Sequence, residues 1–147
     1  MRLRNATDIP DEMVREVIRF VKPSGVSGFD VRLGVAGCGS VIKGKAYWMG
    51  SGYHDTAAPF VNLYLGDVRY PRKPAPPIKS NYLPQPYFAD KTEALVFLAA
   101  HELRHLWQAN VPRGRRVWGS RGQFSERDAD AYAIRLLRAW RTRNDGR

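Results

Sequence analysis

His101 and His105 lie four residues apart within a segment that is otherwise almost continuously apolar. Asp90, with Glu93 three residues later, has the spacing of a helix N-cap, so Lys91 to Ala109 is predicted to be one helix. Because the run from Ala94 to Ala100 is apolar without a break, this helix is expected to be buried on most sides. Buried imidazoles are costly unless a partner satisfies them, and a metal ion is one such partner.

The spacing of the two histidines predicts a shared ligand. Residues four apart lie on the same face of a helix, so both imidazoles can reach one ion. Imidazole nitrogen is a common ligand of zinc, which takes four donors in a tetrahedron. Glu102 lies beside the pair, where it can take a proton from a metal-bound water. The pattern H-E-x-x-H therefore predicts His101 and His105 as zinc ligands and Glu102 as a general base.

A second helix near the C-terminus offers the remaining candidates. It is predicted to begin near Ser125, which suits an N-cap. The apolar positions that define its buried face are Ala129, Ala133, Leu136, Leu137 and Trp140. Glu126 and Asp130 fall at the edge of that face, whereas Asp128 is expected on the opposite side, with Arg135.

A carboxylate on a core-facing side needs a charge partner, and a zinc ion supplies one. Glu126 is therefore predicted as the third zinc ligand. Asp130, one turn deeper, is predicted to accept a hydrogen bond from a ligand imidazole, with His101 as the candidate. The alternative is that both are ordinary carboxylates favoured by the dipole at a helix N-terminus.

The remaining elements indicate a single α+β domain over residues 1–147. Helical periodicity from Met13 to Val21 predicts an N-terminal helix, and period-two alternation from Phe29 to Val35 predicts a strand. Further strands are predicted from Val41 to Met49 and from Phe60 to Leu65, the last apolar on both faces and therefore central. The expected fold is an N-terminal helix, a small mixed sheet of about three to four strands, a long proline-rich loop and two metal-bearing helices.

The loops carry secondary hypotheses. The glycine-rich stretches 37–40 and 50–52 are interpreted as hairpin turns, since neither has P-loop spacing nor opens onto a helix. The proline-rich segment from Gly66 to Ala89 is either a stiff wrap over the sheet or a substrate lid. His54 is a surface histidine or, alternatively, a ligand or transition-state donor at the cleft. Trp118 is expected to anchor the loop from Asn110 to Phe124.

Net charge and cysteine content indicate which partners and which cellular compartment to expect. The net charge of +10 favours contact with nucleic acid, acidic proteins or anionic surfaces, although many small basic proteins share it. The single cysteine, Cys38, excludes an internal disulfide and fits a reducing compartment, so a cytoplasmic location is expected. Residues 1–10 lack the apolar stretch of a secretion signal, and no segment has the length of a membrane span, so no membrane partner is expected.

The paired motifs His101-Glu102-x-x-His105 and Glu126-x-x-x-Asp130 resemble those of gluzincin metallopeptidases, and the short chain looks most like the minigluzincins. The motifs cover roughly Leu95 to Leu137, and the first 90 residues match only in the order of elements. The resemblance implies a zinc peptidase in which Glu126 is the third ligand and Asp130 orients a histidine. Its substrate would be a peptide or protein.

Two function classes follow from these observations. The first is a peptidase in which Glu102 activates a zinc-bound water. The second is a catalytically weak or silent zinc-stabilised domain whose basic surface binds nucleic acid or a protein partner. An intact Glu102 favours the first, while the lack of an assignable oxyanion donor favours the second. SprT-like proteases, which act on protein attached to DNA, combine both, but their third ligand is a histidine and none follows His105.

Overall fold

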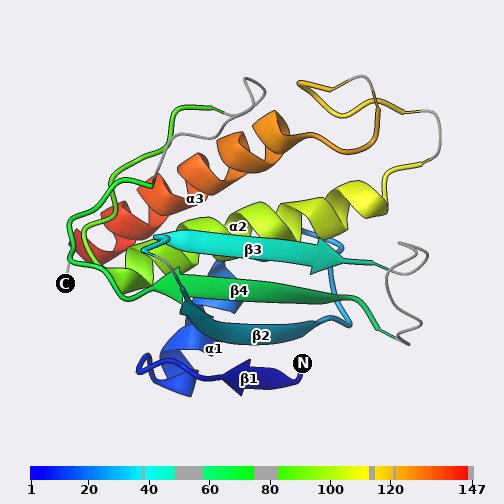
Figure 1. Cartoon of the computed structure of the whole chain (residues 1–147). Helices are drawn as coiled ribbons and strands as arrows, with labels where there is room; N and C mark the ends of the chain where they lie inside the picture. Colours follow the sequence, from blue (N-terminus) through cyan, green and yellow to red (C-terminus); the bar gives the residue numbers. More distant parts are fainter. Residues whose placement is uncertain (38, 49–57, 75–82, 113–114, 121, 146–147) are drawn as a thin grey trace.

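The computed structural model describes residues 1–37, 39–48, 58–74, 83–112, 115–120 and 122–145. Within these residues the chain forms three helices and one four-stranded mixed sheet (Figure 1). In chain order the elements are β1 (Leu3–Asn5), α1 (Asp11–Val21), β2 (Asp30–Ala36), β3 (Ile42–Tyr47), β4 (Phe60–Gly66), α2 (Lys91–Ala109) and α3 (Glu126–Asp145). The predicted α+β class and mixed sheet are confirmed.

The strand order is β1-β2-β4-β3, with β3 antiparallel to β4 and the other pairs parallel. The central position predicted for β4 is confirmed, and its apolar character on both faces agrees with it. Strand β1 was not predicted, because its three residues contain one apolar side chain, Leu3, and carry no readable alternation. At the opposite edge, β3 has a neighbour on one side only among the described strands.

Helices α1 and α2 lie on one face of the sheet, behind it in Figure 1, and α3 packs on α2. Helix α1 buries the stripe Val14, Val17, Ile18 and Val21. Helix α2 packs against α1, β3 and β4 on one side and against α3 on the other. Its residues from Ala94 to Leu103 are all buried, as predicted from the unbroken apolar run. The N-cap prediction is also confirmed, because Asp90 accepts the backbone N–H of Glu93.

One glycine allows the edge strand to approach α2 closely. Gly44, in the middle of β3, faces α2, and a Cβ atom there would lie 2.8 Å from Leu98 Cδ1 and 3.0 Å from Glu102 Cγ. Contacts that short do not occur between real atoms without displacement, so a larger residue would push against the side chain of Glu102. The absence of a side chain at Gly44 therefore brings the edge of the sheet next to the predicted base.

The described parts of the proline-rich segment, 67–74 and 83–89, form no helix or named strand, as predicted, and are tied together by a bridge between Arg72 and Phe88. The anchor predicted in the 110–124 loop was wrong: Trp118 is 61% exposed, and Val117 is the buried residue. Cys38, the turn at 50–52 and His54 lie outside the described residues. None of the described helices has the length and apolar character needed to cross a bilayer.

Candidate metal centre

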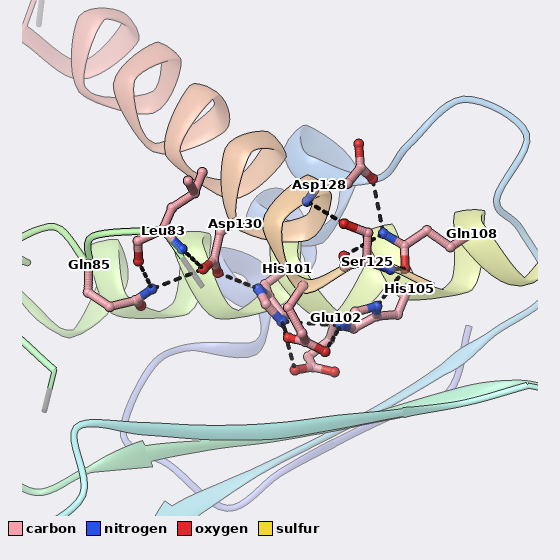
Figure 2. Close-up of polar contacts among 10 residues, drawn as sticks. Leu83, Gln85, His101, Glu102, His105, Gln108, Ser125, Asp128 and Asp130 are labelled. Carbon is pink, nitrogen blue, oxygen red and sulfur yellow. Dashed lines mark hydrogen bonds and ion pairs between the residues drawn. The ribbon is translucent and has the colours of Figure 1, made fainter. Parts of the chain in front are cut away.

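The predicted residues come together where the middle of α2 faces the first turns of α3 (Figure 2). His101, Glu102 and His105 project from α2, and none is more than 9% exposed. Glu126 and Asp130 project toward them from α3. Ser125 caps α3 as predicted, since its hydroxyl oxygen accepts the N–H of Asp128 at 3.0 Å. The cap fixes the first turn of α3 and hence the position of Glu126.

Three of these side chains aim their donor atoms at one point. His101 Nε2 lies 3.0 Å from Glu126 Oε2, and His105 Nε2 lies 3.0 Å from Glu126 Oε1. The two Nε2 atoms are 3.2 Å apart. Two donors bound to one zinc ion at 2.0–2.1 Å with tetrahedral angles lie about 3.3 Å apart. Each imidazole Nε2 is at about this separation from the other and from one oxygen of Glu126, so the cluster fits one small cation.

In each of the two histidines, the hydrogen-bond partner of Nδ1 shows which ring nitrogen carries the proton. His101 Nδ1 lies 2.8 Å from Asp130 Oδ1. A carboxylate can only accept, so Nδ1 of His101 is the protonated nitrogen. Neutral His101 then presents a lone pair on Nε2, toward Glu126. The prediction that Asp130 holds His101 agrees with this contact.

His105 is held in the same way by Gln108, a residue that the sequence analysis did not identify. His105 Nδ1 lies 2.8 Å from Gln108 Oε1. The amide orientation follows from its other partners: Ser125 N–H donates to Oε1, while Nε2 donates to the Ser125 carbonyl and to Asp128 Oδ2. Oε1 is thus an acceptor, Nδ1 of His105 is protonated, and its Nε2 also presents a lone pair.

The converging lone pairs of two imidazoles and a carboxylate repel one another unless a positive charge lies between them. Burial works to lower the pKa of His101, but hydrogen bonds to Asp130 and Glu126, together with the charge of Glu102, raise that pKa to about 10. Burial works to raise the pKa of Glu126, but hydrogen bonds from both histidines hold it well below its ordinary value. Either a proton or a metal ion can supply the positive charge between these groups, so protons and metal ions compete for the site.

Glu102 lies beside the three donors and outside their cluster. Its Oε1 is 3.9 Å from His101 Nε2, too far for a hydrogen bond, and the side chain is almost fully buried. Burial raises the pKa of Glu102, against the lowering influence of the neighbouring histidines. A carboxyl with a raised pKa, next to a cation site and without a hydrogen-bond donor among the described residues, suits proton transfer.

The cluster opens into a cleft of about 580 Å³ between edge strand β3 and the two helices. Residues 40–46, most of them in β3, line one side, while His101, Glu102, His105 and Glu126 line the other. At one end Trp48 stacks on Phe124, with ring centroids 4.5 Å apart. The site is therefore a groove that runs along a strand and is accessible to a ligand larger than water.

The proline-rich segment also reaches the site. Asp130 Oδ2 accepts the backbone N–H of Leu83 at 3.1 Å and the Gln85 Nε2 amide at 3.2 Å (Figure 2). Gln85 and Pro74 also line the cleft. The described ends of this segment therefore lie beside the two C-terminal helices, and they fix the carboxylate that holds His101. Sequence alone gave no signal for this contact, which joins residues 45 and 47 positions apart.

The expected orientation of Asp128 was wrong. It faces α2, where Arg104 donates to it from Nε at 2.7 Å and Gln108 from Nε2 at 3.0 Å. A helical wheel ranks positions on one helix only and takes no account of long side chains that reach over from its neighbour. Because α3 begins beside the last turns of α2, the flank that carries Asp128 is also within reach. Asp128 thereby supports the amide that holds His105.

Comparisons with protein-family models, with curated proteins and with solved structures give no match to this chain.

We expect Glu126→Ala to weaken zinc binding far more than Asp128→Ala. The first substitution removes a donor, and a loss above about 100-fold in affinity is expected. The second removes one of several supports of Gln108, and about 10-fold is expected. Competition between each purified variant and a chromophoric chelator measures both affinities. Equal losses would show that Glu126 is no ligand.

Gln108→Leu removes the acceptor that fixes His105 while keeping a side chain of similar size. We expect zinc affinity to fall about 10- to 100-fold, as for other partners that orient a metal-binding histidine. Gln123→Leu is the matched control, because among the described residues Gln123 donates to two backbone carbonyls at the end of α2, those of Gln108 and Ala109. A similar loss in both variants would indicate a general effect of loosening this end of α2.

Zinc binding is expected to release at least one proton and to strengthen with pH. With a folded-state pKa of about 10, His101 is protonated at neutral pH, and zinc must displace that proton. Apparent affinity should then rise about tenfold per pH unit between pH 7 and 9. Isothermal titration calorimetry in buffers of different ionisation enthalpy counts the protons. Asp130→Asn removes a contact that raises this pKa, so it should flatten the dependence; a pH-independent affinity would contradict the argument.

Proposed function

We propose that this chain is a zinc-dependent peptidase whose metal is held by His101, His105 and Glu126. The observation that carries the proposal is the convergence of the two Nε2 atoms and the Glu126 carboxylate, with Glu102 next to them and without a hydrogen-bond donor among the described residues. Three protein donors leave one position of a tetrahedron open, which is the arrangement of catalytic zinc sites. A structural site would be closed by a fourth side chain.

A zinc ion held there supplies Lewis acidity, polarising a peptide carbonyl and making a water acidic enough to react near neutral pH. Glu102 then takes the proton from the attacking water and passes it to the leaving amine. Its raised pKa keeps the proton long enough for the second transfer. Asp130 and Gln108 hold the two imidazoles from behind, so that their Nε2 atoms keep their direction through the cycle.

The substrate class follows from the cleft. Strand β3 is at the edge of the sheet and lines the cleft opposite Glu102. An extended peptide can pair with the free edge of such a strand through backbone hydrogen bonds, which bind any sequence. The stacked pair Trp48 and Phe124 then offers an apolar surface to one of its side chains. A peptide substrate agrees with the resemblance of the motifs on α2 and α3 to those of the gluzincins.

The decisive experiment combines metal analysis with cleavage of a peptide library. We expect hydrolysis that is lost with a chelator and restored by zinc. Glu102→Gln should bind zinc as the wild type does and lose about 10²- to 10⁴-fold in rate, since only the proton acceptor is removed. Glu12→Gln, an exposed position on α1, is the control. Unchanged cleavage by Glu102→Gln would exclude the role of this residue, and zinc binding without cleavage of any peptide would exclude the peptidase.

A further inference from the structure

The face of the sheet opposite the helices is built differently from the rest of the surface. Strand pairing places Arg4, Arg32, Asn62 and Lys45 side by side in one row across the four strands. The adjacent row on the same face contains Gly34, Tyr64 and Lys43. The helices cover the other face, and in Figure 1 this one lies in front of them. Within the described residues, the sheet therefore has one basic and aromatic face, hereafter the outer face.

The described strands place four basic side chains and one acidic side chain on the outer face. Arg4, Arg32, Lys43 and Lys45 are all exposed. The only acidic strand residue on this face is Asp30, and its carboxylate accepts the backbone N–H of Arg2. Among the described residues, no carboxylate forms a salt bridge with Arg4, Arg32 or Lys43. Arg4, Arg32 and Lys43, three cations at strand spacing on one face, attract a polyanion.

Aromatic rings lie between these cations. The ring of Tyr64 is 36% exposed and lies against Gly34, where a Cβ would be 3.2 Å from two of its carbons. Together with Arg4 and Arg32 it borders a shallow hollow of about 250 Å³. The guanidinium of Arg32 also lies 4.5 Å above the ring of Phe60. An exposed ring bordered by two arginines offers stacking to a flat, anion-bearing ligand.

We propose that the outer face binds single-stranded nucleic acid. Arg4, Arg32, Lys43 and Lys45 contact the phosphates, and a base stacks on Tyr64 beside the hollow. Basic side chains that follow a backbone, interleaved with rings that accept any base, are the features by which proteins bind single strands without sequence preference. The phosphates of a duplex could also contact the cations. No base of a duplex could stack on Tyr64, however, because the bases of a duplex are already stacked on each other.

Binding at the outer face requires neither peptidase activity nor a metal. The side chains of Lys43 and Lys45 lie on the outer face, whereas Gly44 between them faces α2. All three residues also line the cleft, so strand β3 contributes to both surfaces. A failure of nucleic-acid binding would leave the zinc site unaffected, and a protein without bound zinc can still be tested for nucleic acid.

The test is fluorescence anisotropy with labelled oligo(dT) and oligo(U), with a mixed-sequence duplex and poly-aspartate as competitors. We expect both single strands to bind and both competitors to be weak. The logarithm of affinity should fall with the logarithm of salt concentration with a slope of about −3, as four phosphate contacts on a single strand predict. Stronger competition by duplex, or by poly-aspartate at equal charge, would overturn the proposal.

Two sets of variants locate the surface. Tyr64→Leu should weaken binding about 5- to 100-fold through loss of stacking, while Tyr64→Phe should keep it. Arg4→Ala with Lys43→Ala should lower the affinity and reduce the salt slope by about 1.4. Arg19→Ala with Arg138→Ala, both exposed on helices, removes the same charge from elsewhere. Equal losses in the two double variants, or no difference between Tyr64→Leu and Tyr64→Phe, would contradict binding at the outer face.

Discussion

The contact between α2 and α3 depends on a positive charge at one point between them. When His101 is neutral, two imidazoles and a carboxylate, contributed by two helices, direct lone pairs at one another from about 3 Å. Neither imidazole can rotate to relieve that arrangement while Asp130 and Gln108 hold the opposite nitrogens. A cation bound between these groups removes the repulsion and links the two helices. Its binding free energy then adds to the stability of the folded state.

The donors are held by hydrogen bonds that are themselves buried and satisfied. Asp130 is 1% exposed and Gln108 is fully buried, so each would be costly without partners. Asp130 uses one oxygen for His101 and the other for Leu83 and Gln85. Gln108 uses its carbonyl for His105 and Ser125 N–H and its amide for Ser125 and Asp128. Neither histidine can turn without leaving a buried polar group unpaired, so the site is rigid before any ligand binds.

The parts of this site that sequence could predict are those fixed by local geometry. Helical spacing alone places His101, Glu102 and His105 together, and the N-cap rules locate the ends of α2 and α3 through Asp90 and Ser125. Contacts between residues far apart in the chain leave no periodic pattern in the sequence, so they could not be predicted in this way. Asp128 was misplaced because Arg104 and Gln108 reach it from another helix, and the support from Leu83 comes from an irregular segment. Gln108 did leave a signal, an amide three residues after His105 in an apolar run.

The same limit applies to the sheet. The alternation in β2 correctly predicted the burial of Val31 and Leu33 but not the exposure of Val35, which is 57% exposed. Neither this alternation nor the apolar character of β4 indicated which strands are neighbours, because pairing order is set by connections and not by period. The short strand β1 was missed, and with it the row that joins Arg4 to Arg32. A basic surface could be predicted from net charge, whereas its location on one face requires the register.

Protection of the sheet edges offers another reason for charges on this sheet, since lysine on an edge strand discourages pairing with a second chain. That reason accounts for Lys43 and Lys45 on β3 and for Arg4 on β1, which are the two outermost strands. It does not account for Arg32 on β2 or Tyr64 on β4, because both strands already have a neighbour on each side. An exposed ring and an unpaired guanidinium in the middle of the sheet protect no edge. Their position next to each other is what a stacked, phosphate-bearing ligand requires.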